Sequence, residues 1–245
     1  MDDDKQLRPV FGTNNLLDFN LKENLPSLLN LGSARRTFNA WQSGSLVDGV
    51  GQVWIIADLL ADIWRTDSAT AAYFVGSIPL SDRANFGGQE CVKYSAVIYR
   101  LLEIMQSPIP NKRREYLRLS ESMGQQARDA DAVEVIRLRH TEFIADTKSQ
   151  LKAKRIQQHN IQYDELTGYS LDVRSAEFHH IRRQSIHTNL ISMIWNGVVI
   201  NKDTHDLITS RYISDEYDLL ALCQEMEWDQ SWFKPYEQNI LYFEL

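Results

Sequence analysis

The sequence of 245 residues lacks the features that define several large classes of protein. It has two cysteines, Cys91 and Cys223, which lie far apart, so a disulfide scaffold and a four-cysteine zinc ribbon are excluded. No apolar run approaches the roughly 20 residues that span a bilayer, since Asp58 and Asp62 interrupt the most hydrophobic stretch. Residues 1–5 are acidic and polar, unlike a secretory signal. We therefore expect a cytoplasmic protein without a membrane partner.

The composition is otherwise that of an ordinary globular protein, with 43% hydrophobic and 24% charged residues. The formal net charge of −7 argues against tight nucleic-acid binding driven by bulk charge alone. The charge is uneven, however, because residues 112–212 include 16 basic and 13 acidic side chains, whereas residues 213–245 include 1 and 8. We expect the middle segment to be the part that faces a polyanion.

Hydrophobic periodicity predicts a largely helical chain up to about residue 160. The predicted elements are a buried helix over 53–64, a loop over 76–88, a helix over 92–105, a helix from 112 to about 123, and a long charged helix from 130 to about 159. Pro108 and Pro110 stop the helix predicted over 92–105, and we take them as a domain boundary.

The pattern changes after residue 172. Two short extended segments, 174–181 and 197–201, precede a helix that starts near Lys202, and a last helix is predicted over 215–228. The acidic C-terminal segment also carries an aromatic patch, which we expect to pack or to bind protein because acidic neighbours repel phosphate. The patch consists of Trp228, Trp232, Phe233 and Tyr236.

Four of the six histidines fall in a short segment near the C-terminus. They are His179, His180, His187 and His205. The pair His179-His180 ends the first extended segment and is followed by Ile181, while Asn196 opens the second one. His205 comes early in the helix beyond it. Imidazole titrates near neutral pH and binds metals, so this cluster is a candidate site for both kinds of chemistry.

This order of residues resembles the HNH endonuclease family, whose fold is the ββα-metal finger. The resemblance covers residues 163–211, with sixteen positions from His180 to Asn196 and nine from Asn196 to His205. Asn189 is a second candidate for the central asparagine, but it lies further from His205 than the pattern favours. His187 has no place in the pattern, and we interpret it as a loop histidine.

The resemblance implies a role for each motif residue. His179 and His205 would be metal ligands, and His180 would activate the attacking water as a general base. Asn196 would fix the loop that carries His180, or bind the metal. Arg182 and Arg183, together with Lys202 and Arg211, are candidate phosphate contacts, although a solvated loop is the plainer interpretation.

The sequence departs from the family pattern in two respects. Many relatives carry a second helical histidine where this chain has Thr209, and many have paired cysteines around the motif, which are missing here. A site with fewer imidazoles and more water ligands favours Mg²⁺ or Mn²⁺ over Zn²⁺.

The basic run on the long helix has two interpretations. Lys148, Lys152, Lys154 and Arg155 lead into the motif, so contact with DNA is one of them. A solvated helix face is the other, and it is the one that we favour.

The predicted fold is α+β and mostly α. It comprises a helical N-terminal domain for recognition or partner binding (1–110), a helical connector (111–162), the HNH ββα-metal finger (163–212), and an acidic C-terminal helix and tail (213–245). The predicted activity is that of a metal-dependent HNH endonuclease that hydrolyses phosphodiester bonds in DNA, with RNA not excluded. Family habits suggest a prokaryotic restriction or phage-defence setting, and the acidic total charge suggests a protein partner or a homo-oligomer. The alternative is a non-catalytic protein-interaction scaffold with a degenerate finger.

Overall fold

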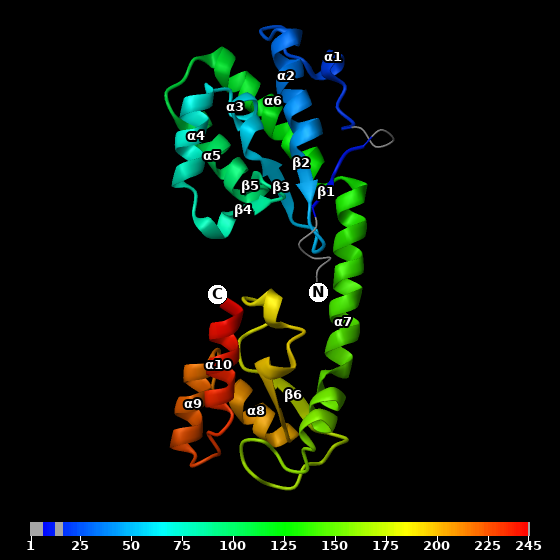
Figure 1. Cartoon of the computed structure of the whole chain (residues 1–245), viewed down its shortest axis with the longest axis vertical. Helices are drawn as coiled ribbons and strands as arrows, with labels where there is room; N and C mark the ends of the chain where they lie inside the picture. The colour runs from blue at the N-terminus through cyan, green and yellow to red at the C-terminus, as the bar shows by residue number, and fades with distance from the viewer. Residues whose placement is uncertain (1–6, 13–16, 245) are drawn as a thin grey trace. The chain divides into compact units, whose positions relative to one another are not determined.

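The computed structural model describes residues 7–12 and 17–244, and the chain divides into two compact units, Met1–His140 and Thr141–Leu245. Residues 1–5, which are unlike a secretory signal in the sequence, lie outside the described residues. The fold is α+β and mostly helical, as predicted (Figure 1). Within 7–12 and 17–244, no helix combines the length and the apolar character needed to cross a membrane.

The first unit contains an antiparallel sheet surrounded by helices. Its described strands are ordered β1-β2-β3-β5-β4. They are β1 (Arg8–Pro9), β2 (Ser45–Val47), β3 (Val53–Ile56), β4 (Arg83–Phe86) and β5 (Gln89–Lys93). The helices are α1 (Leu21–Asn24), α2 (Leu31–Gly44), α3 (Leu60–Ile63), α4 (Ser68–Ser77), α5 (Tyr94–Gln106) and α6 (Asn111–Arg128), with 3₁₀ turns η2 (Ala57–Leu59) and η3 (Leu80–Asp82).

Two of the predicted elements of this unit are wrong. The predicted helix over 53–64 is the strand β3 followed by η2 and α3, because a short run that is apolar on all sides fits a buried strand as well as a helix. The predicted loop over 76–88 includes β4, whose turn into β5 uses Gly87 and Gly88 at positive φ angles of 61° and 88°. The helix predicted over 92–105 is confirmed as α5.

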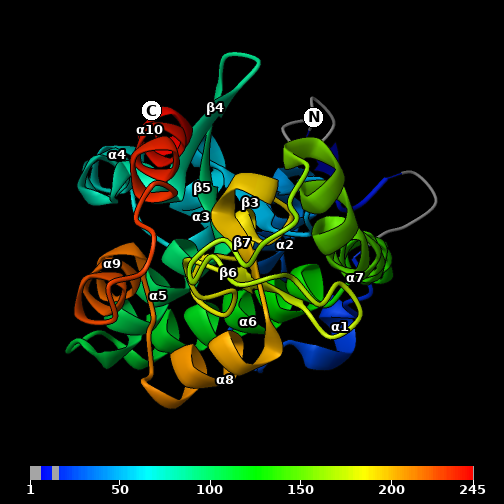
Figure 2. The same ribbon diagram turned by 90° about the horizontal axis from the view of Figure 1, so that it is seen from below.

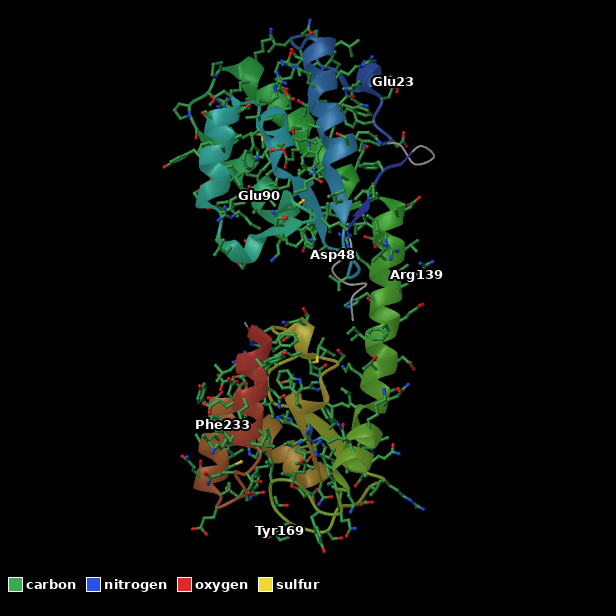
Figure 3. The ribbon with its side chains drawn as sticks, viewed as in Figure 1. Glu23, Asp48, Glu90, Arg139, Tyr169 and Phe233 are labelled. Carbon is green, nitrogen blue, oxygen red and sulfur yellow. The ribbon has the colours of Figure 1, made fainter. Side chains whose placement is uncertain are left out.

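Buried tryptophans join the helices of the first unit. The indole nitrogen of Trp41 donates to the Ser120 hydroxyl at 2.9 Å, and that hydroxyl donates to the carbonyl of Ile63 at 2.9 Å. The indole of Trp64 donates to the carbonyl of Val97 at 3.0 Å. At the end of β2, Asp48 accepts from the indole of Trp54 at 2.9 Å (Figure 3). The helices α5 and α6, on either side of the two prolines, thus belong to one core.

The helix α7 (Asp131–His159) confirms the predicted long helix, and the division between the two units falls within it. Along this helix Phe143 is 61% exposed, whereas Leu151 is buried. After a loop come two strands and three further helices. These are β6 (Glu177–His180), β7 (Gly197–Ile200), α8 (Lys202–Ser210), α9 (Glu216–Glu225) and α10 (Phe233–Glu244), with η4 (Thr188–Leu190) and η5 (Ile194–Asn196) between the strands.

The strands β6 and β7 pair antiparallel, and α8 packs against β6 (Figure 2). His179 lies opposite Val198, and His180 lies opposite Gly197. All four residues of β7 are buried. Beneath the hairpin, Trp232 and Tyr236 join the hydrophobic core of this unit, which confirms that the aromatic patch packs. The helix α10, which begins at Phe233, was not predicted (Figure 3).

Buried polar groups fix the start of α8. The carboxylate of Asp164 accepts from the backbone nitrogen of Asn201 at 2.8 Å and from the hydroxyl of Thr204 at 2.7 Å. The Asn201 side chain in turn accepts from the backbone nitrogen of Asp172 at 2.9 Å and donates to the carbonyl of Ser170 at 3.1 Å. The loop between α7 and β6 therefore sets the position of α8, and with it that of His205.

Gly197 stands where the hairpin closes most tightly. A Cβ at this position would lie 2.4 Å from the Phe178 ring and 2.6 Å from the carbonyl oxygen of His179. We expect Gly197→Ala to destabilise the second unit by about 1–3 kcal/mol, the usual cost of overpacking a filled site. Hydrogen exchange of the β6 and β7 amides across a urea series measures this change. Gly76→Ala in α4 is the control, because a Cβ there meets no atom within 4 Å. Equal effects of the two substitutions would contradict the account.

Candidate functional site

The two predicted metal ligands lie next to each other. His179 is in β6 and His205 is in α8, and their ring centroids are 5.3 Å apart with the planes at 71°. Helix α8 packs on the hairpin, so a residue one turn into the helix reaches the next-to-last residue of β6. The structure thus brings together two imidazoles that are 26 positions apart in the sequence.

Glu177 completes this cluster and was missed in the sequence. Its carboxylate lies 3.2 Å from Nδ1 of His205, and its other oxygen lies 3.7 Å from Nζ of Lys202. Because a carboxylate only accepts, this contact places a hydrogen on Nδ1 of His205, so a metal would have to bind through Nε2. A carboxylate that orients a histidine in this way is common around protein metal sites. Glu177 stands two residues before His179, so strand alternation alone already puts both on one face of β6.

His179 is uncharged at neutral pH. Burial, together with the smaller effects of the neighbouring imidazoles of His205 and His180, lowers its pKa from 6.5 to about 4. A neutral ring keeps a nitrogen lone pair free to bind a cation.

His180 is held through both ring nitrogens. Its Nε2 lies 2.9 Å from the carbonyl oxygen of Ile191, and its Nδ1 lies 2.6 Å from Nε2 of Gln184. Burial lowers the pKa of His180, and the Lys148 ammonium lowers it as well, while the bond to Ile191 acts in the opposite sense. Neutral imidazole is the form that a general base requires.

The two adjacent histidines lie on different faces of β6. Side chains alternate along a strand, and the ring of His180 lies with that of Phe178, at a centroid distance of 4.9 Å, whereas His179 lies with His205. The two residues are nevertheless consecutive in the chain, so they share the end of β6. A substrate that uses both would have to reach around the end of the strand.

Asn196 is buried, and its hydrogen bonds join parts of the loop between β6 and β7. Its side-chain oxygen accepts from the backbone nitrogen of Arg182 at 3.2 Å, and its amide donates to the carbonyl of Leu190 at 3.2 Å. Its backbone carbonyl accepts from the nitrogen of Ile181 at 2.9 Å. This is the loop-fixing position suggested for Asn196, whereas the second candidate, Asn189, is exposed in η4.

The four candidate phosphate contacts all have partners within the protein. Arg182 forms two hydrogen bonds to the buried carboxylate of Glu216, at 2.9 and 2.6 Å. Taking Arg182 away would leave that carboxylate buried and unpaired, so we assign Arg182 a structural role. The other three carry weaker contacts near the surface. Arg183 donates to the carbonyl of Tyr212 at 3.2 Å, Lys202 lies 3.5 Å from Asp206, and Arg211 lies 3.1 Å from Glu225.

The solvated face that we favoured for the basic run on α7 holds for Lys148 and Lys154, which are exposed, but not for Lys152 and Arg155. Arg155 is buried and makes a bidentate ion pair with Glu165, both bonds at 2.8 Å, and also donates to the carbonyl of Ile194 at 2.9 Å. Lys152 donates to the carbonyls of Val173 and Ala176. These long side chains serve the fold because the loops around the hairpin expose carbonyl groups toward α7. Lys154 is exposed as expected.

The side chains at this site could bind a metal ion only through a small number of protein ligands. Among residues 7–12 and 17–244, no group of three or more histidine, cysteine or acidic side chains is arranged to hold a metal ion. His179 and His205 provide two imidazole rings, and Thr209 is exposed on α8. A cation held there would complete its shell with water and phosphate oxygens, as Mg²⁺ and Mn²⁺ commonly do.

Comparison of the chain with protein-family models, with curated proteins and with solved structures finds no match. The likeness to the HNH family therefore depends on the motif residues and on their arrangement.

The low pKa of His179 makes the stability of the second unit depend on pH. Between pH 6.5 and 4 the unfolded chain binds a proton at His179 that the folded protein does not bind. The stabilisation that comes from neutral His179 is therefore complete above pH 6.5 and is lost as the pH falls toward 4. In EDTA, we expect the free energy of unfolding to fall between pH 7 and pH 5, and His179→Gln to flatten that fall. Exchange of β7 amides in urea measures it, with His159→Gln as the control, and a slope unchanged by His179→Gln would contradict the assignment.

Proposed function

We propose that the second unit is an HNH endonuclease that hydrolyses phosphodiester bonds in DNA with a divalent metal, Mg²⁺ or Mn²⁺ in preference to Zn²⁺. The observation that carries the proposal is the convergence of His179 and His205, 5.3 Å apart on a β-hairpin and the helix behind it, beside a histidine held as a neutral base. The order of strand, strand and helix supports the identification of residues 163–212 as the family's finger.

In this proposal His180 is the general base. Its Nδ1 accepts a proton from water, the hydroxide attacks phosphorus, and the bond from phosphorus to the leaving oxygen breaks, with that oxygen taking a proton from solvent. The Ile191 carbonyl, 2.9 Å from Nε2, holds the ring in the tautomer that presents Nδ1 and stabilises the imidazolium that forms. Asn196 keeps the loop that carries Ile191 in place.

His179 and His205 would hold the metal through neutral nitrogens, with Glu177 orienting His205. A divalent cation supplies charge neutralisation for the phosphate and its leaving oxygen. Arg183, Lys202 and Arg211 are the candidate contacts to the DNA backbone that we retain, since their present partners lie near the surface.

The alternative function, a non-catalytic interaction scaffold built on a degenerate finger, is favoured by two observations. Both ring nitrogens of His180 are occupied by protein groups, and the described residues include no metal site of three or more ligands. Cleavage assays separate the two functions, since a scaffold would bind a protein partner without turnover.

The wider setting of the activity is also part of the proposal. DNA is the proposed substrate because most relatives with this motif cut DNA, and RNA in the same assay would reveal the other preference. The first unit would supply recognition or bind a partner protein or a second copy of the chain. A cytoplasmic restriction or phage-defence role follows the habits of the family.

The role of His180 as the general base can be tested by cleavage. We expect His180→Ala to slow nicking of supercoiled plasmid in Mn²⁺ by about 10²-fold or more, the usual contribution of a general base. His187→Ala is the matched control, because His187 lies in the loop that follows β6 and outside the motif. Far-UV circular dichroism checks that both variants fold. A His180→Ala protein that nicks at the parental rate would show that His180 is not the base. Full activity of the parental protein in EDTA would show that cleavage needs no divalent metal.

The assignment of His205 as a metal ligand can be tested by metal binding. We expect His205→Ala to weaken Mn²⁺ binding at least about tenfold in calorimetry, since even the loss of an outer partner of a ligand costs that much. His159→Ala, which removes a histidine from the end of α7, should leave the affinity unchanged. Equal Mn²⁺ affinity of His205→Ala and the parent would exclude His205 as a ligand.

A further inference from the structure

A chain of three hydrogen bonds passes through His180 and includes Nδ1, the nitrogen that the proposed base would use. Nζ of Lys148 in α7 donates to Oε1 of Gln184 at 2.5 Å. Nε2 of Gln184 lies 2.6 Å from Nδ1 of His180, and Nε2 of His180 lies 2.9 Å from the carbonyl oxygen of Ile191. Four residues from α7, the loop after β6 and β6 itself thus meet at one imidazole.

The acceptors in this chain determine where the hydrogens are. A carbonyl oxygen only accepts, so Nε2 of His180 carries the hydrogen that bonds to Ile191, and Nδ1 holds the lone pair. The ammonium of Lys148 only donates, so it binds the oxygen of the Gln184 amide and turns the amide nitrogen toward His180. Lys148 therefore selects the orientation in which Gln184 donates to Nδ1.

This arrangement covers the lone pair of His180. A donor at 2.6 Å takes the position that a water would need in order to give its proton to Nδ1. Gln184 is a flexible side chain on a loop, so rotation about its own bonds is enough to uncover the nitrogen.

Lys148 connects this cover to an anion. It is exposed, and the group that it binds is a neutral amide. A phosphate oxygen is a stronger acceptor for an ammonium than a neutral amide is. A phosphate that draws Lys148 away would remove the contact that holds Gln184 in its donating orientation.

We propose that Gln184, held by Lys148, is a latch that covers the His180 base nitrogen in the free protein, and that a substrate phosphate opens it by binding Lys148. This inference rests on the proposed nuclease function for its purpose, but the covered nitrogen is measurable without cleavage. Gln184 is a positioning residue in this scheme, because it acts through His180.

The direct test is the reactivity of His180 toward diethyl pyrocarbonate, which modifies unprotonated imidazole nitrogen. On the full chain in EDTA at pH 8, we expect Gln184→Ala to raise the modification rate of His180 roughly two- to tenfold, the range that one hydrogen bond accounts for. Peptide mass spectrometry gives the rate at each histidine. Ser185→Ala, in the same exposed loop, should leave the rate unchanged. An unchanged rate in Gln184→Ala would overturn the latch.

Nitrogen NMR tests the role of Lys148. With ¹⁵N-labelled histidine, assigned by the loss of its signal in His180→Ala, the Nδ1 resonance should move toward that of a free lone pair in Gln184→Ala and in Lys148→Met. Inorganic phosphate should move the parental resonance in the same direction and have no effect in Lys148→Met. Lys154→Met, which removes the same charge from an exposed position of α7, should behave as the parent does. A phosphate response that survives in Lys148→Met would overturn the opening step.

Cleavage separates the latch from the nuclease itself. At DNA concentrations below saturation, we expect Gln184→Ala to nick plasmid faster than the parent by the same two- to tenfold, because no latch has to be opened. Slower nicking by Gln184→Ala would overturn the latch, since the amide would then be needed in turnover. If the parent does not nick at all, the nuclease proposal fails, and the reactivity and NMR results still decide whether the nitrogen is covered.

Discussion

The arrangement of the second unit depends on the closure of the loop between its two strands by the buried side chain of Asn196. One amide binds the chain at both sides of the loop, at the backbone nitrogen of Arg182 and at the carbonyl of Leu190. The carbonyl of Ile191, next along the chain, is then at the right distance to take the hydrogen of His180. An apolar residue in place of Asn196 would leave two buried backbone groups unsatisfied, which costs about 1–3 kcal/mol each.

The two adjacent histidines have different surroundings, which suit them to different proposed roles. His179 is paired with His205 and kept neutral by burial, and Glu177 sets the tautomer of His205. His180 is bonded instead to neutral groups, a carbonyl and an amide, on the other face of the strand. The proposed cation site and the proposed base would thus come from neighbouring positions, because a strand sends successive side chains to opposite faces.

The sequence predicts well what depends on local order and poorly what depends on tertiary contacts. The long helix α7 agrees with its prediction within a residue or two at each end, and the histidines and Asn196 were found from their spacing. The run 53–64 was misassigned because its first four residues, which form β3, are all apolar and fit a buried strand as well as a helix. The helix α10 was missed because Pro235 hides a helix start that proline tolerates in the first turn.

The partners of the site residues show the same limit. Gln184 and Glu216 look like ordinary polar surface residues in the sequence. Their importance appears only when the fold brings the first to His180 and the second to Arg182, 34 positions away. The buried ion pair of Arg155 with Glu165 is of the same kind, since a basic residue on a long helix is typically solvated.

The central claim is that His179 and His205 together hold a divalent cation within reach of a neutral base. Electron spin-echo spectroscopy of Mn²⁺ bound to protein labelled with ¹⁵N-histidine tests it most directly, because each coordinated imidazole adds a nitrogen coupling. The account predicts couplings from two histidines in the full chain, reduced to one when residue 205 is alanine. A bound Mn²⁺ that shows no histidine nitrogen coupling would contradict it.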